Sequence, residues 1–288
     1  MRTEQEMMAL ILGEARADDR VRAVLLEGSR TDPNARRDVL QDYDIAYIVT
    51  ETAPFWQDVH WIDRFGTRLY MQRPDDFPFE PGDRAARYAW LMQFEDGVRL
   101  DLQVMTLEYA LKHDFRESLC RVLLDKHRIL PPHSLNSDRD FWTKKPTQAE
   151  FAAVCNEFWW CMNNVAKGIR RGEDSYVQDM TNAHVRPQLM QLLCWKAGLR
   201  HGWSVSPGKM GKRLPQLLPE ADWADYRASF FRCEPEEMWE AAERMARQFA
   251  ALERELAEAL RYSWNEAEAR GSTEWLRRVR AMASIHAE

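Results

Sequence analysis

The sequence of 288 residues predicts an α+β protein with two domains, a sheet-containing domain in residues 1–135 and an α-helical bundle in residues 136–288. Two observations carry this prediction. Short apolar runs of strand-forming residues occur only in the first part of the chain, whereas apolar residues from Thr147 onward recur with the period of a helix. Between the two patterns, Pro131 and Pro132 precede a polar stretch that is typical of a linker.

The first domain is expected to begin with a helix over residues 3–18, because Met7, Ile11 and Ala15 share one helical face. Asp96 and Gly97 are a strong turn signal and predict a hairpin between the two runs beside them. A short helix is expected around residues 55–62, and residues 32–38 have the composition of a loop. The expected strands are residues 21–27, 43–49, 68–72, 88–94, 98–105 and 119–124.

The second domain is expected to contain only helices. Its first helix begins at Thr147, where Thr147 and Glu150 have the spacing of a capping box. The later helices follow from the same apolar periodicity. The expected helices are residues 147–171, 174–198, 209–218, 222–231 and 235–263.

Composition narrows the classes of function. The formal net charge of −6 argues against nucleic acid as the main partner and suits a polycationic small molecule. The five cysteines form an odd set without a Cys-x-x-Cys pair, which indicates reduced thiols in a cytosolic protein. No apolar run approaches the length of a membrane span, and the N-terminus lacks the apolar core of a signal peptide. We therefore expect a cytoplasmic protein without a membrane partner.

The stretch from residue 24 to residue 49 carries the clearest chemical signal. A strand ends on Gly28 and Ser29, and after a polar spacer Asp42 and Asp44 open the next strand. Side chains two residues apart in a strand share a face, so the two carboxylates point the same way. Such a pair is unfavourable unless a cation lies between its members, and Mg²⁺ prefers oxygen ligands. The structural alternative is an ordinary turn followed by a solvated strand edge.

A third carboxylate follows in a neighbouring strand. Asp101 shares the polar face of its strand with Arg99 and Gln103, while the other face is apolar. A buried, unpaired carboxylate is costly, so Asp101 either forms a cross-strand salt bridge with an arginine or completes the metal site. Within the metal site, its role as a metal ligand or as a general base stays open.

The order of strand, Gly-Ser, spacer and Asp-apolar-Asp-apolar resembles the nucleotidyltransferase superfamily. Further motifs extend the likeness, and the chain from about Glu4 to about Arg261 resembles the aminoglycoside 6-adenylyltransferases, which adenylylate streptomycin. The chain departs from the family pattern at Asp32 and Pro207. The motifs, in order, are GSRTDPN (28–34), QDYDI (41–45), WIDRFG (61–66), FEDGVRLDL (94–102), NEFWW (156–160), VAKG (165–168) and VRP (185–187).

The resemblance implies a fold and an activity. The fold is a nucleotidyltransferase domain with a mixed sheet, joined to a helical substrate-binding domain, with the active site between them. The activity is Mg²⁺-dependent transfer of AMP from ATP to the 6-hydroxyl of streptomycin, which confers antibiotic resistance. The protein is expected to be a monomer or a homodimer.

The resemblance also implies roles for particular residues. Asp42, Asp44 and Asp101 are expected to be catalytic and to hold the metal ion. The expected nucleotide-binding residues are Gly28, Ser29, Arg30 and Lys209, and the expected substrate-binding residues are Glu157, Trp160 and Asp179.

Alternatives to several of these roles remain. Arg30 is otherwise a surface ion pair, and Lys209 is otherwise a solvated lysine at the start of a helix. Glu157 or Asp179 is an alternative source of the catalytic base. The alternative functions are nucleotidyl transfer to another small molecule or to a macromolecule, and nucleotide binding without catalysis.

Overall fold

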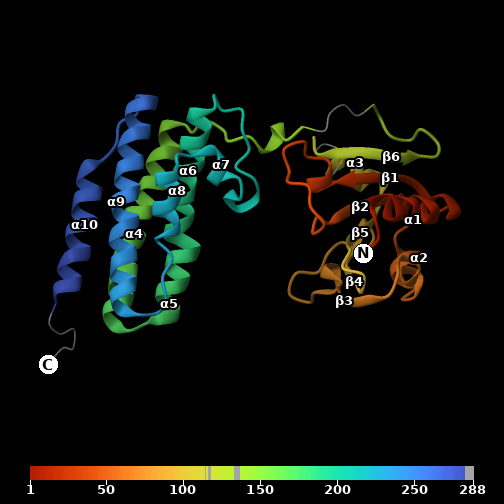
Figure 1. Cartoon of the computed structure of the whole chain (residues 1–288), viewed down its shortest axis with the longest axis horizontal. Coiled ribbons are helices and arrows are strands. Elements are labelled where there is room, and N and C mark those ends of the chain that lie inside the picture. Colours follow the sequence, from red (N-terminus) through yellow and green to blue (C-terminus); the bar gives the residue numbers. More distant parts are fainter. Residues whose placement is uncertain (114, 116–117, 133–136, 283–288) are drawn as a thin grey trace. The chain divides into compact units, whose positions relative to one another are not determined.

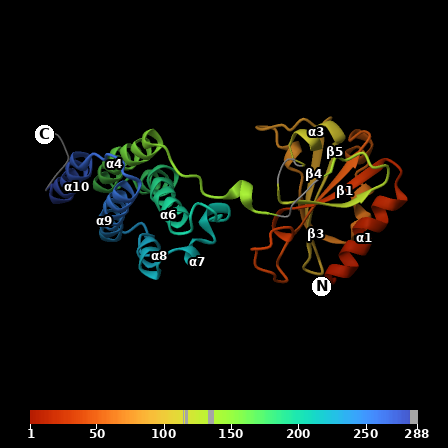
Figure 2. The same ribbon diagram turned by 90° about the horizontal axis from the view of Figure 1, so that it is seen from above.

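The computed structural model describes residues 1–113, 115, 118–132 and 137–282, and these form two compact units (Figures 1 and 2). The first unit is Met1–Asp140 and the second is Phe141–Glu288. The domain boundary expected after residue 135 falls in residues 133–136, which lie outside the described residues.

The first unit is built on a six-stranded mixed sheet with the strand order β3-β4-β5-β2-β1-β6, which confirms the predicted fold class (Figure 1). Strands β2 and β5 are parallel, and all other neighbouring strands are antiparallel. The strands are β1 (Val21–Glu27), β2 (Tyr43–Val49), β3 (Arg68–Gln72), β4 (Arg87–Phe94), β5 (Arg99–Thr106) and β6 (Cys120–Asp125).

The predicted hairpin is present between β4 and β5, where Gln93 pairs with Arg99. Gly97 closes the turn with a φ of +85°, a backbone conformation that favours glycine. Strands β1 and β2 are largely buried on both faces, and their alternate residues enter two separate apolar clusters. The helices therefore cover the sheet from both sides.

The helices of the first unit cover these two faces. Helix α1 (Glu4–Ala17) begins with a capping box of Thr3 and Glu6 and buries Met7, Ile11 and Ala15 in the larger cluster. The aromatic segment after β2 joins the same cluster. It consists of α2 (Ala53–Trp56) and a 3₁₀ turn, Trp61–Phe65. Helix α3 (Leu107–Lys112) packs in the smaller cluster on the opposite face.

The second unit is helical, as predicted (Figure 2). Its core contains a stacked pair, Phe158 and Phe249, with ring centroids 3.7 Å apart. Helix α4 packs against α6, α9 and α10. The helices are α4 (Gln148–Arg171), α5 (Asp174–Asp179), α6 (Arg186–Arg200), α7 (Leu214–Leu217), α8 (Glu220–Arg227), α9 (Pro235–Leu260) and α10 (Glu266–Ala281). No helix in the described part of the chain has both the length and the apolar character needed to cross a membrane.

Three expectations for this unit need correction. The helix expected over residues 209–218 is instead a 3₁₀ turn, Lys209–Gly211, followed by the short α7, and Met210 has a non-helical backbone. The helix predicted over residues 174–198 is interrupted by a π-helical turn, Met180–Val185. The sequence did not reveal this turn, because a single wider turn leaves the apolar periodicity almost unchanged. Helix α10 was not predicted. Only Ala269, Leu276 and Val279 of its sixteen residues are buried, so its apolar stripe is too narrow to stand out in the sequence.

Candidate active site

Acidic side chains form a row where β1, β2 and β5 run side by side. Asp44 of β2 is the register partner of Glu27 on β1 and of Asp101 on β5. Residues directly opposite each other on neighbouring strands point to the same face of a sheet, so the three carboxyl groups share one face. Asp42 lies two residues before Asp44, directly before the first residue of β2, and extends the row past the start of this strand.

The electrostatics show that these carboxylates affect one another. Burial, followed by the negative charges of Asp101 and Asp42, raises the pKa of Asp44 to about 6. Burial also raises the pKa of Asp42, although the nearby Arg99 opposes the shift. The fold thus holds like charges together in a partly buried place, an arrangement that a cation would relieve.

Gly28 lets the chain approach Asp44 closely. Its φ is +64°, and a Cβ atom at this position would lie 2.4 Å from Oδ2 of Asp44. A side chain of any other residue would therefore meet both backbone strain and a steric clash. The 3₁₀ turn Gly28–Arg30 directly beside the carboxylates depends on this glycine.

The expected nucleotide-binding side chains next to Gly28 are engaged with the segment before β2. The buried guanidinium of Arg30 donates to the backbone oxygens of Gln41 and Asp42, at 2.9 Å each. It also lies over the ring of Tyr43, 3.6 Å from the centroid. Ser29 accepts a hydrogen bond from Gln41 at 3.1 Å. Arg30 therefore fixes the approach to β2, and its contact with a triphosphate stays a prediction.

Arg99 pairs with the acidic row. Its Nε and Nη2 donate to the two oxygens of Asp101 at 2.9 and 2.8 Å, and its Nε lies 3.7 Å from Oδ2 of Asp42. The alternative considered for Asp101 was a salt bridge across strands, but this arginine comes from the same strand, two residues earlier. Alternation along β5 places both side chains on one face.

The donor set fits a hard divalent cation such as Mg²⁺. All of its members are carboxylate oxygens, and burial, with a smaller contribution from neighbouring carboxylates, raises the pKa values of Asp42 and Asp44. Among the described residues, no three His, Cys, Asp or Glu side chains are already arranged as a metal site. Asp101 is instead paired with Arg99, which bonds both of its carboxylate oxygens.

The sequence analysis missed a polar chain on the same sheet face. Gln103 donates to Glu27 at 2.8 Å and accepts from Arg87 at 2.6 Å. Because the guanidinium can only donate, it fixes the orientation of the amide and directs its NH₂ group toward Glu27. The alternation of β1 could have indicated that Glu27, its last residue, points to this face. An acid next to Gly-Ser was instead compatible with an ordinary turn.

In the second unit, Lys209 is exposed in a loop with an unusual backbone. Gly208, Met210 and Gly211 all have positive φ values, of 72°, 55° and 74°. A positive φ is strained for methionine, and strain of this kind often occurs at ligand-binding sites. The backbone is compatible with the predicted phosphate contact of Lys209, which stays a prediction.

The three expected substrate-binding residues lie on two helices of the second unit. Glu157 and Trp160 are exposed one turn apart on α4, and Asp179 is exposed at the end of α5. Trp160, at 67% exposure, faces a shallow hollow that it shares with Trp275 of α10. These positions are accessible to a ligand, and their role stays a prediction.

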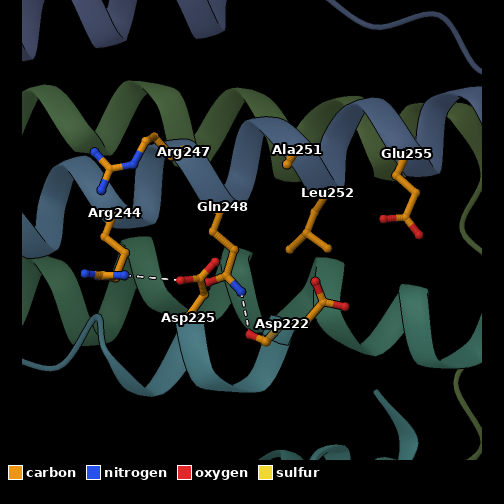
Figure 3. Close-up of a pocket in the computed structure, with 8 residues that line it drawn as sticks. All are labelled: Asp222, Asp225, Arg244, Arg247, Gln248, Ala251, Leu252 and Glu255. Carbon is orange, nitrogen blue, oxygen red and sulfur yellow. Dashed lines mark hydrogen bonds and ion pairs between the residues drawn. The ribbon is translucent and has the colours of Figure 1, made fainter. Parts of the chain in front are cut away.

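Another hollow, of about 300 Å³, lies between α8 and α9 (Figure 3). Most of its charged groups are paired within the protein. Arg244 reaches Asp225 at 3.2 Å, and the ammonium of Lys196 lies 2.8 Å from Asp222 and 2.7 Å from Glu255. Because these charges are already paired, we assign this hollow no part in the chemistry.

Nearly the whole chain is similar to known proteins. The family model described as streptomycin adenylyltransferase matches residues 1–279. An aminoglycoside 6-adenylyltransferase of Bacillus subtilis (strain 168) is 35% identical over 267 residues, which cover 92% of this chain and 93% of the relative. One from Campylobacter jejuni is 36% identical over 265 residues, covering 92% and 91%.

Two further proteins are similar to this chain. An aminoglycoside 6-adenylyltransferase of Staphylococcus aureus is 34% identical over 232 residues, covering 80% of this chain and 82% of the relative. The crystal structure of an aminoglycoside 6-adenyltransferase from Bacillus subtilis aligns at 31% identity with a TM-score of 0.49, covering 98% of this chain and all of that one.

We predict opposite effects for alanine at two glycines of the first unit. Gly28→Ala should lower the free energy of unfolding by about 1–3 kcal/mol, because it combines a strained φ with a clash against Asp44. Gly13→Ala is the matched control. No atom lies within 4 Å of its added Cβ, so the helix α1 should gain about 0.5–1 kcal/mol. Urea unfolding of the full-length variants measures both, and equal effects would contradict the assigned role of Gly28.

Asp44→Asn should change how stability depends on pH in metal-free buffer. Because the folded pKa of Asp44 is raised from 3.8 to about 6, the folded protein binds this proton more tightly than the unfolded chain. The wild type therefore loses stability as pH rises through this window, and the variant avoids that loss. The stability of Asp44→Asn relative to wild type should rise between about pH 4 and 6 and then level off.

Asp63 supplies a control of opposite sign, since the hydrogen bond from Arg68 lowers the pKa of its carboxyl. Asp63→Asn should therefore show no gain over wild type as pH rises across the same window. Thermal unfolding at each pH measures both variants. A difference between Asp44→Asn and wild type that stays flat from pH 4 to 6 would show that the pKa of Asp44 is not raised in the folded protein.

Proposed function

The chain belongs to the streptomycin adenylyltransferase family, and on that premise we propose that it transfers AMP from ATP to the 6-hydroxyl of streptomycin with Mg²⁺. It is an adenylyltransferase, and its relatives carry the name aminoglycoside 6-adenylyltransferase. The choice of streptomycin, the dependence on Mg²⁺ and a role in antibiotic resistance are parts of the proposal.

One observation carries the proposed chemistry. Asp44 and Asp101 face each other in register on parallel strands, and Asp42 adjoins them. Gly28 brings the preceding turn to within contact of Asp44. This combination supplies oxygen ligands for a metal next to a segment of backbone that is free of side-chain bulk, which suits a bound triphosphate.

The three aspartates would hold Mg²⁺, which on binding neutralises triphosphate charge and stabilises the charge that develops on the transferred phosphoryl group. The protein's own contribution is positioning. Arg30 anchors the segment before β2, and Gly28 sets the distance between the turn and the carboxylates. We assign the turn at Ser29 and the exposed Lys209 to the nucleotide phosphates.

In the proposed transfer, the streptomycin hydroxyl oxygen bonds to the α-phosphorus and the bond from that phosphorus to the pyrophosphate oxygen breaks. The hydroxyl proton must pass to a base within hydrogen-bond reach. Asp101 is one candidate, and Glu157 or Asp179 from the helical unit is the alternative.

The acceptor that we propose is a polycation, which suits exposed acids beside an aromatic ring. Glu157 provides a carboxylate and Trp160 an indole face one helical turn away on α4. A guanidinium group is attracted to both kinds of partner. Asp179 adds a further acid, and the net charge of −6 favours approach of a cation. We place the activity in the cytoplasm, where ATP and Mg²⁺ are present.

The direct test of the function is product identification. The protein should be incubated with ATP, Mg²⁺ and a panel of aminoglycosides, and the products analysed by mass spectrometry. Streptomycin carrying one added AMP is the expected product, and fragmentation should locate it on the 6-hydroxyl. AMP on another aminoglycoside alone would change the acceptor, whereas nucleotide binding without any product would contradict the catalytic role.

Substitutions in the two units should separate chemistry from acceptor binding. Asp42→Asn and Asp44→Asn each remove a charge from the metal site, so turnover should fall by about two to four orders of magnitude. Aminoglycoside affinity should change little in these variants. Glu157→Gln should weaken aminoglycoside binding while Mg-ATP affinity stays near that of the wild type. Steady-state turnover and calorimetry with each ligand distinguish the patterns.

Asp63→Asn serves as the control, because it removes an exposed carboxylate from the same unit without touching the acidic row. It should keep the turnover of the wild type. Near-normal adenylylation by both Asp42→Asn and Asp44→Asn would place the metal elsewhere.

A further inference from the structure

The acidic row already has a cationic partner in the protein itself. Arg99 bonds both oxygens of Asp101, and its Nε also lies 3.7 Å from Oδ2 of Asp42. The resulting site brings a guanidinium into the same small space as the carboxylates that suit a divalent cation. A carboxylate bonded through both oxygens to arginine has its strongest acceptor directions filled. A metal ion that binds Asp101 must therefore compete with Arg99.

The geometry of Arg99 permits such an exchange. Its side chain is 43% exposed, so the guanidinium can rotate toward solvent without disturbing the core. Asp101 is less exposed, at 18%, and stays with the strand when the arginine leaves. Ion pairs of this exposure are worth little in water, which makes displacement by a divalent ion feasible.

Resting on the metal site of the proposed function, we propose that Arg99 is the resident counter-ion of the acidic row. In the metal-free protein its guanidinium offsets part of the repulsion among Asp42, Asp44 and Asp101. A divalent cation displaces it from Asp101 and takes over that role. Arg99 is thus a positioning residue that sets the affinity of the site for cations, and it keeps the carboxylates aligned when no cation is bound.

The test measures Mn²⁺ binding to the nucleotide-free protein from the electron paramagnetic resonance signal of free Mn²⁺. Arg99→Gln removes the competitor and should bind Mn²⁺ roughly 1.5- to fivefold more tightly than wild type, the range set by an ion pair of this exposure. Arg99→Lys keeps the charge but cannot bond both oxygens at once. It should show a smaller increase in affinity in the same direction.

The chain offers a closely matched control in Arg20. Its Nε and Nη2 bond the two oxygens of Asp18 at 2.9 and 2.6 Å, with the same two-residue spacing and a side-chain exposure of 42%. Arg20→Gln should leave Mn²⁺ affinity unchanged. In the wild type, adding Mn²⁺ should raise the reactivity of Arg99 toward phenylglyoxal, measured by peptide mass spectrometry, while that of Arg20 stays constant.

The outcomes separate the possible roles. Weaker Mn²⁺ binding by Arg99→Gln would overturn competition and show that the arginine supports the metal. If Arg99→Lys matches wild type while Arg99→Gln binds more tightly, only through-space charge is at work and displacement is wrong. Failure of every protein to bind Mn²⁺ would overturn the metal site and this proposal together. If the protein binds Mn²⁺ and adenylylates normally, but Mn²⁺ does not change the reactivity of Arg99 toward phenylglyoxal, this proposal is wrong and the proposed function stands.

Discussion

Mutual repulsion of carboxylates on one face of the sheet is the constraint on which the site depends. The parallel pairing of β2 with β5 puts Asp44 opposite Asp101, and Asp42, just before β2, shares Arg99 with Asp101. Burial, and then the charges of Asp101 and Asp42, raise the pKa of Asp44. A fold that needed only stability would not gather these charges, whereas a site for a divalent cation and a triphosphate requires them.

The surrounding residues make this arrangement tolerable. Arg99 offsets charge on Asp101 and Asp42 in the absence of metal, and Arg30 fixes the segment before β2 through backbone oxygens. Gly28 supplies the close approach of the preceding turn to Asp44. Both arginines act through geometry as well as charge, because a planar guanidinium holds two oxygens in fixed directions.

The strands and the long helices could be predicted because each follows a single period, and the shared face of Asp42 and Asp44 follows from alternation alone. Pairing between distant strands is different, since no local pattern states that Asp44 lies beside both Glu27 and Asp101. The pairing of Asp101 with Arg99 could have been predicted, because Arg99 lies two residues earlier on the same face of the same strand. The sequence does not single out this pair, since an arginine can reach several acids. Helix α10 was missed because it buries so little.

The position of a divalent cation in a crystal grown with Mn²⁺ and a non-hydrolysable ATP analogue is the most direct measurement. An anomalous difference peak should lie about 2 Å from carboxylate oxygens of Asp42 and Asp44, with phosphate oxygens completing its coordination and Arg99 withdrawn from Asp101. A Mn²⁺ ion bound by other residues, with the acidic row still closed by Arg99 while the nucleotide is in place, would contradict the assignment of this row as the catalytic metal site.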